Sequence, residues 1–312
     1  MVHPSESATF AAATEPPPHA CLSPARRKDP PLSRALVLGG GGITGIAWEV
    51  GLLLGLRDDG VDVTVADTVV GTSAGSVVGA QLAGGVPLQE MYDAQLEDPT
   101  GEIAASMTRS MGLTWVATML LPGKGETRRR RLGRAAVRAS RRPGAVSVEE
   151  RLDVFATRLS VSLWPDRDLR ITAVDADTGE FVVFGRECRV DLVHAVASSC
   201  AVPLVWPPVP VGDRRYVDGG VRSAANADVP RGAERVVVLA PLPQSLSRHH
   251  RIDAQLARTG ARATAAVSPD AAALEAIGRN MLDPANRAAS ARAGYAQAPS
   301  VAAEVSRAWG RP

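Results

Sequence analysis

A single serine stands among small residues in the segment VVGTSAGSVVGA, Val69–Ala80. Gly71 and Gly75 lie two residues before and two residues after Ser73, which is the G-x-S-x-G pattern between a predicted strand and a predicted helix. In that context a serine projects from a tight turn, and the flanking glycines let the facing backbone approach closely. The N-terminus of the following helix offers free N–H groups to developing negative charge. We therefore predict that Ser73 is a nucleophile.

A second glycine-rich turn, GGGITG over residues 40–45, supports two interpretations. It satisfies the G-x-G-x-x-G fingerprint of dinucleotide binding, for which the ribose-binding acid would be Asp58, Asp59 or Asp62. Alternatively, successive backbone N–H groups form an oxyanion hole, whose donors would be Gly40, Gly41 and Gly42. The dinucleotide interpretation leaves GTSAG unexplained. The oxyanion interpretation makes the two glycine-rich turns two walls of one site.

A nucleophilic serine needs an acceptor for its proton, and the chain offers few histidines for that role. His3 and His19 lie in the N-terminal segment, and His194 lies in an apolar, helical run where a structural role is expected. His249 or His250, in the polar segment SLSRHHR, would form a triad with Ser73 and Asp218 that keeps the chain order Ser, Asp, His.

Asp218 is the stronger candidate for the base. The segment YVDGG places its carboxylate at the end of a predicted strand, and Gly219 and Gly220 let backbone crowd it. A carboxylate beside the serine hydroxyl accepts its proton if partial burial raises the carboxyl pKa. A turn aspartate without chemistry is the alternative, since aspartate is common before glycine in turns.

The elements that position these residues follow a strand, glycine turn, helix order. Two such units are predicted from strands Arg34–Leu38 and Asp67–Gly71 and helices Ile43–Arg57 and Ser73–Leu82, and they indicate a parallel α/β sheet. Further predicted elements are an antiparallel hairpin of Arg170–Val174 and Glu180–Phe184, a helix at Leu192–Ser199, and strands at Arg215–Val217 and Arg235–Ala240. We expect a disordered segment over residues 1–33 and one domain over 34–312, with a helical portion over 252–312.

Positive charge is concentrated in the segment Lys124–Arg142. This segment contains nine basic residues and one acidic residue, whereas the net charge of the whole chain is only +2. Such a cluster attracts anionic lipid headgroups, and the arginines expected to do so are Arg128, Arg129, Arg130 and Arg131. With the apolar stretch Met111–Leu121 it would form a membrane-facing lid. A solvated, mobile basic insertion over 122–147 is the alternative. No aromatic residue interleaves with the arginines, so we expect no nucleic acid partner.

Composition places the chain among globular proteins, with 312 residues, 45% apolar and 22% charged. Three scattered cysteines, Cys21, Cys188 and Cys200, form no metal-ligand spacing and no disulfide framework. The N-terminal residues lack the apolar core of a signal peptide, and the glycines within Ala35–Leu56 argue against a membrane span there. We expect a cytoplasmic protein, with peripheral contact to membranes, and no metal or cofactor.

Four motifs in order resemble the patatin-like phospholipase family. They are the glycine turn LGGGGITG, the serine turn GTSAG, the segment ASSCAVPLVWPPV (Ala197–Val209) and the segment VDGGVRSAANAD (Val217–Asp228). The resemblance implies a three-layer α/β/α fold with a central, mostly parallel sheet. It also implies a Ser73–Asp218 dyad without histidine and an oxyanion hole at the first turn. Thr44 departs from the family, which often has arginine or lysine at that position.

The resemblance implies a serine lipid acyl hydrolase that cleaves fatty acyl esters of (lyso)phospholipids or neutral lipids through an acyl-enzyme. Two alternatives stay open at this point. One is a dinucleotide-binding protein that uses residues 40–45. The other is a catalytically silent, membrane-associated protein of the same fold.

Overall fold

A computed structural model describes residues 33–98, 111, 113–114, 117–118, 121–243 and 248–310. The predicted disordered segment, residues 1–33, lies outside this part of the chain except for Ser33, which is buried. The apolar stretch Met111–Leu121 is described only in part, so the predicted lid lies largely outside the described residues.

A mixed sheet runs through the described chain in the order β5-β6-β3-β2-β1-β7-β8, with β4 paired to β3. Its strands are β1 (Arg34–Leu38), β2 (Thr68–Gly71), β3 (Asp168–Asp175), β4 (Phe181–Phe184), β5 (Val209–Val211), β6 (Arg214–Asp218), β7 (Arg235–Leu239) and β8 (Ala263–Val267). The pairs formed among β3, β2, β1, β7 and β8 are parallel, whereas β4, β5 and β6 pair antiparallel.

Strands β2 and β6 meet end to end along one side of β3. Ile171 of β3 pairs with Gly71 of β2 on one side and with β4 on the other. Ala173 pairs with β4 and, on the opposite side, with Asp218 of β6. The last residues of β2 and β6 therefore point toward each other, with only Thr172 between their partners on β3.

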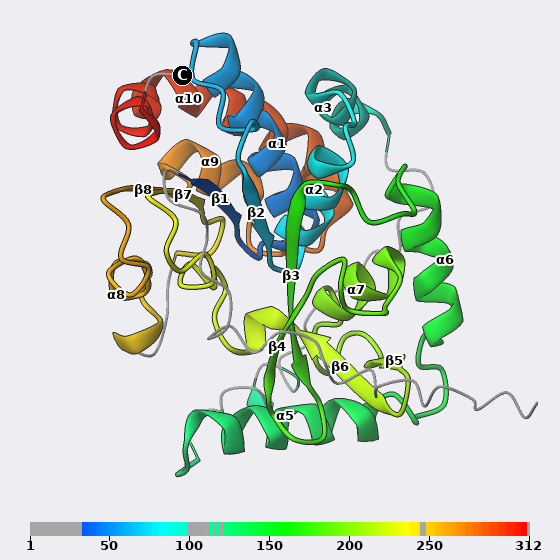
Figure 1. Cartoon of the computed structure of the whole chain (residues 1–312). Coiled ribbons are helices and arrows are strands. Elements are labelled where there is room, and N and C mark those ends of the chain that lie inside the picture. Colours follow the sequence, from blue (N-terminus) through cyan, green and yellow to red (C-terminus); the bar gives the residue numbers. More distant parts are fainter. Residues whose placement is uncertain are drawn as a thin grey trace, which may run out of the picture.

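Helices cover both faces of the sheet, which makes a three-layer α/β/α fold (Figure 1). One face carries α1 (Gly42–Asp58), α2 (Ala74–Ala83), α3 (Leu88–Leu96), α6 (Val148–Arg158), α7 (Leu192–Ser199), α9 (Ala271–Ile277) and α10 (Arg287–Trp309). The other face carries α5 (Gly125–Ala139), α8 (Ile252–Leu256) and residues 225–233. Successive side chains of β1 point to opposite faces of the sheet. Leu36 and Leu38 pack on the face that carries α1 and α10, and Ala35 and Val37 pack on the face that carries α8.

The predicted central strands, the hairpin and the helix at Leu192–Ser199 are confirmed. The C-terminal portion is only partly helical, because β8 lies within it and extends the sheet beside β7. The segment Ala263–Val267 was predicted wrongly because its alanines do not signal a strand by themselves. Its backbone pairs with β7, and this pairing decides its conformation.

The basic segment 122–147 is not a mobile insertion, because most of it forms α5 and packs on the fold. Leu132, Gly133 and Ala136 are buried on one side of α5, and a Cβ atom at Gly133 would lie 2.2 Å from the carbonyl oxygen of Ala176. The apolar contact holds α5 on the fold despite its high positive charge, because the arginines occupy the other faces of the helix. Among the described residues, no helix is long and apolar enough to cross a membrane.

Candidate active site

Ser73 occupies a strained turn between β2 and α2. Its backbone has φ 51° and ψ −116°, a conformation that a residue with a Cβ rarely adopts. The N–H of Ser73 donates to Oγ of Ser199 at 2.9 Å, and its carbonyl accepts from Oγ of Ser76 at 2.6 Å and from Sγ of Cys200 at 3.3 Å. Hydrogen bonds with three residues thus hold the backbone of the strained turn. Ser73 lines two pockets.

The glycines on both sides of Ser73 allow this turn to pack against the sheet. A Cβ atom at Gly75 would lie 2.1 Å from the carbonyl oxygen of Leu38, and one at Gly71 would lie 2.5 Å from Cα of Ser76. Both contacts are with backbone, which has no room to move. The close approach expected from the G-x-S-x-G pattern is present at both positions.

Asp218 ends β6 and is buried beside Ser73. Burial raises the pKa of its carboxyl to about 7, while the N–H of Gly220 and the side chain of Ser73 oppose the rise. The N–H of Gly220 donates to Oδ1 of Asp218 at 2.7 Å. Gly219 packs so tightly that a Cβ atom there would lie 2.2 Å from Oγ1 of Thr172. The meeting of β2 and β6 across Thr172 therefore brings the predicted base to the predicted nucleophile.

The first glycine turn lines the same pocket as Ser73 and Asp218. Gly40 donates its N–H to the carbonyl of Ala224 at 2.8 Å, so this donor is occupied. In the described chain, the N–H groups of Gly41 and Gly42 have no acceptor. Gly42 has φ +61°, and a Cβ atom at Gly41 would lie 2.5 Å from Cβ of Pro241. The two available donors are thus Gly41 and Gly42, at the N-terminus of α1.

Sequence reasoning missed the N–H of Ala74 as a possible donor to an oxyanion. Ala74 follows Ser73 and begins α2, where the first N–H groups of a helix have no partner inside the helix. Within the described chain, this N–H has no acceptor. The G-x-S-x-G pattern itself carried the signal, since the residue after the nucleophile supplies such a donor in related turns.

Asn226 is another residue that sequence reasoning missed. Its buried Nδ2 lies 3.1 Å from Oγ1 of Thr72, 3.3 Å from Oγ1 of Thr172, 3.2 Å from the carbonyl oxygen of Gly219 and 2.8 Å from that of Ser223. Two hydrogens are shared among these four acceptors. The amide joins the serine turn to the aspartate turn, eight residues beyond Asp218 in the chain.

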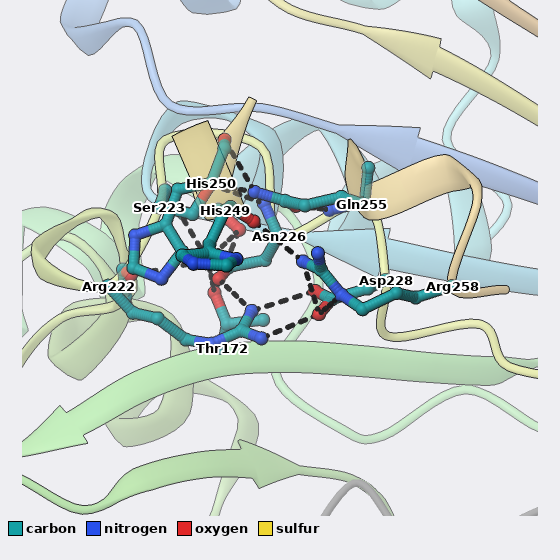
Figure 2. A network of polar contacts seen from close by, with 12 residues as sticks. Thr172, Arg222, Ser223, Asn226, Asp228, His249, His250, Gln255 and Arg258 are labelled. Atoms are coloured by element: carbon teal, nitrogen blue, oxygen red, sulfur yellow. Dashed lines mark hydrogen bonds and ion pairs between the residues drawn. The ribbon is translucent and has the colours of Figure 1, made fainter. Parts of the chain in front are cut away.

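The two histidines considered as bases take part in the polar network around Asn226 and Asp228 through their backbone carbonyls (Figure 2). The carbonyl of His249 accepts from Arg258 at 2.9 Å, and that of His250 accepts from Gln255 at 2.7 Å. Burial and the nearby Arg222 lower the pKa of His250. Neither histidine lines the two pockets that contain Ser73. The geometry therefore favours Asp218 over a histidine.

Asp228 is the centre of that network. Arg222 donates to both of its carboxylate oxygens at 2.8 and 2.7 Å, and Arg258 donates to Oδ2 at 3.1 Å (Figure 2). These charged hydrogen bonds hold the pKa of the Asp228 carboxyl below its usual range, against the effect of burial. Arg222 also donates to Oδ1 of Asn226 at 2.8 Å, so the ion pairs orient the amide that joins the two turns.

The dinucleotide interpretation does not match the arrangement of the acids. Asp58 ends α1, and Asp59 and Asp62 follow it. A helix from Gly42 to Asp58 is about 24 Å long, so these carboxylates lie far from the glycine turn that would hold the pyrophosphate. The turn instead shares its pocket with Ser73 and Asp218.

Residues 36–231, more than half of the chain, match the patatin-like phospholipase family, and the chain belongs to this family. Membership implies a lipid acyl hydrolase and a lipid substrate. A comparison with curated proteins found no match.

Solved structures with some likeness include two bacterial proteins. VipD from Legionella pneumophila is 12% identical with a TM-score of 0.45, over 88% of this chain and 67% of that one. ExoU, in its complex with SpcU from Pseudomonas aeruginosa, is 17% identical with a TM-score of 0.38, over 90% of this chain and 52% of that one. The chain thus spans about half the length of ExoU.

Proposed function

We propose that the protein is a serine lipid acyl hydrolase that uses a Ser73–Asp218 dyad. The observation that carries the proposal is one pocket lined by Ser73, Asp218 and the free N–H groups of Gly41 and Gly42. A nucleophile, a base and oxyanion donors are the three parts that acyl transfer requires.

In the first half of the reaction, Oγ of Ser73 attacks the ester carbonyl carbon while Asp218 takes the hydroxyl proton. The tetrahedral oxyanion is stabilised by the N–H groups of Gly41 and Gly42. Asp218 then gives its proton to the alkoxide oxygen as the ester C–O bond breaks, and the alcohol leaves an acyl-serine.

In the second half, Asp218 takes a proton from water, and the resulting hydroxide attacks the acyl carbonyl. The second tetrahedral intermediate collapses to the carboxylic acid, and the proton returns from Asp218 to Oγ of Ser73. A carboxyl with a pKa of about 7 suits both directions of transfer, because it accepts and releases a proton near neutral pH.

Hydrolysis of p-nitrophenyl esters of increasing acyl length tests the proposal. Wild type should turn over, whereas Ser73→Ala and Asp218→Asn should lose at least about a thousandfold in kcat while their circular dichroism stays native. Retained activity in Asp218→Asn would exclude the dyad. Silence of the folded wild type toward esters of every length would favour a catalytically silent protein.

A peripheral membrane contact through α5 belongs to the same proposal. Arg130, Arg131, Arg134 and Arg138 are exposed on α5, which lies along the lower edge of the molecule in Figure 1. Of the four arginines expected at the membrane, Arg128 and Arg129 are half-buried and donate to the carbonyls of Leu121 and Gly179. The exposed arginines on the rest of the helix support contact with anionic lipid headgroups.

A further inference from the structure

Ser73 also lines a second pocket, whose lining does not include Asp218. Helix α6 forms one wall of this pocket with Arg151, Val154, Phe155 and Arg158, a spacing that puts all four on one helix face. Cys200, Val202 and Trp206 line it from the chain after α7. No aspartate or glutamate lines it. The nucleophile therefore faces a pocket that is apolar apart from two arginines and small polar groups.

The guanidinium of Arg151 is held by aromatic rings. It lies 3.8 Å from the ring centroid of Trp206 and 4.9 Å from that of Phe155. Both aromatic side chains are buried, and stacking on them limits the rotamers of a long side chain. The cation is thus positioned in advance, as a binding group must be if it is to act without a large entropy cost.

The guanidinium of Arg151 has no hydrogen bond and no ion pair with any residue that the structure describes, and outside its helix the residue bonds only through its backbone N–H, which donates to the carbonyl of Ser147 at 3.4 Å. Burial, together with the charge of Arg158, lowers the pKa of Arg151 to about 10, so the group stays protonated at neutral pH. A partly buried cation without a counter-ion is unfavourable, and an incoming anion relieves this cost. Arg158 lines the same pocket.

We propose that Arg151 determines substrate specificity by binding a phosphate group that the acyl ester carries near its scissile bond. A guanidinium matches phosphate oxygens with two parallel N–H donors, and a phosphate next to a glycerol ester is within reach of a pocket that also contains the nucleophile. This inference rests on the proposed hydrolase function.

Two substrates that differ only by a phosphate test it: 1-decanoylglycerol and 1-decanoylglycerol 3-phosphate, both below their micellar concentrations. Wild type should have a higher kcat/KM for the phosphate ester. Arg151→Met keeps the length and apolar contacts of the side chain, and should lower that value about 10- to 100-fold, the loss of one or two charge-assisted hydrogen bonds. The kcat/KM of Arg151→Met for the neutral ester should differ from that of the wild type by less than about threefold.

Arg292→Met, at an exposed position on α10, is the matched control and should affect neither substrate. Equal losses on both substrates would show that Arg151 only supports the pocket, and unchanged values on both would also overturn the proposal. Activity on the neutral ester in every variant would leave the hydrolase function intact in either case.

A binding measurement separates the inference from turnover. In the Ser73→Ala background, calorimetry with n-decyl phosphate and uncharged n-decyl maltoside should show tighter binding of the phosphate. Adding Arg151→Met should weaken the binding of n-decyl phosphate by about tenfold or more and leave the binding of n-decyl maltoside unchanged. If decyl phosphate binds equally with and without Arg151, the proposal is wrong, whether or not the wild type hydrolyses esters.

Discussion

The side-chain amide of Asn226 donates to the hydroxyl of Thr72 across 3.1 Å, and so connects the loop after Asp218 to the residue before Ser73. The same amide nitrogen lies 3.2 Å from the carbonyl oxygen of Gly219. Asn226 has φ 48°, a conformation that asparagine tolerates better than most residues. One buried side chain therefore bridges the two turns that carry the proposed dyad.

Replacing Asn226 should lower kcat more than it changes KM. Asn226→Gly keeps the backbone conformation and removes the amide, so it isolates the hydrogen bonds from strain. We expect a kcat loss of about 10- to 100-fold, because a small displacement of base from nucleophile is costly. Asn226→Asp, which replaces donor by acceptor at equal size, should behave similarly. The measurement is hydrolysis of a p-nitrophenyl ester at a temperature where circular dichroism shows a folded protein. An unchanged kcat would contradict the prediction.

The pH dependence of kcat/KM should follow Asp218. The carboxyl must be deprotonated to accept the serine proton, and its pKa is about 7, so activity should rise with pH and reach half its plateau near pH 7. Below that point the value should fall about tenfold per pH unit. A profile that is flat from pH 5 to 8 would contradict the assignment of Asp218 as the base.

Removal of the serine hydroxyl should raise the pKa of Asp218 further. The Ser73 side chain lowers that pKa in the wild type, so Ser73→Ala removes a stabilising contact of the carboxylate. Carbon-13 NMR titration of labelled aspartate in both proteins measures the shift. An unchanged or lower midpoint in Ser73→Ala would mean that the two side chains do not interact.

Glu49 should destabilise the protein as the pH rises. It is fully buried in α1, and neither carboxyl oxygen has a hydrogen bond of good geometry among the described residues, although the backbone of Gly39 lies close enough to oppose the rise of its pKa. Burial raises its pKa well above the usual range, so the folded state holds a proton that the unfolded state releases above about pH 4.3. Stability from this group is present at low pH and is lost as the pH rises toward the folded-state pKa.

Thermal unfolding of Glu49→Gln tests this sign. The melting temperature of the variant, relative to wild type, should increase from pH 5 to pH 8, because glutamine has no proton to lose. Glu304→Gln, at an exposed site on α10, is the control. A relative melting temperature of Glu49→Gln that decreases over this range would contradict the assignment.

The fit of the serine turn against β1 should tolerate no methyl group at Gly75. A Cβ atom there would meet the carbonyl oxygen of Leu38 at 2.1 Å, so Gly75→Ala should displace the turn and abolish activity. Gly79, one turn later in α2, is the control, because its nearest contact would be a methyl group of Val69 at 3.1 Å. Gly79→Ala should be folded and active, helped by a helix propensity gain of about 1 kcal/mol. Esterase activity of the two variants decides between these outcomes.

Neutralising α5 should weaken binding to anionic vesicles. Exchanging Arg130, Arg134 and Arg138 for glutamine removes about 3 kcal/mol of attraction, or roughly 100-fold in affinity. The control exchanges three exposed arginines elsewhere, namely Arg186, Arg251 and Arg292. Cosedimentation with vesicles of phosphatidylglycerol and phosphatidylcholine measures both. Equal binding of the α5 variant and the wild type would exclude this contact.

Local sequence determined the parts of the protein whose conformation depends on neighbours in the chain. Apolar runs that end in glycine are sufficient for β1 and β2, and the small residues around Ser73 specify its turn because no Cβ atom fits at Gly71 or Gly75. The order of four short motifs was enough to indicate the family that residues 36–231 confirm.

Tertiary structure decided what depends on partners distant in the chain. Ala263–Val267 became a strand because β7 offered an open edge, and α5 became ordered because the sheet accepts its apolar side. The N–H of Gly40, predicted as an oxyanion donor, is instead bonded to the carbonyl of Ala224, nearly two hundred residues away. Strand register decides that β2 and β6 meet on β3. Packing between distant segments places the amide of Asn226 and the cation of Arg151. Local sequence patterns encode neither.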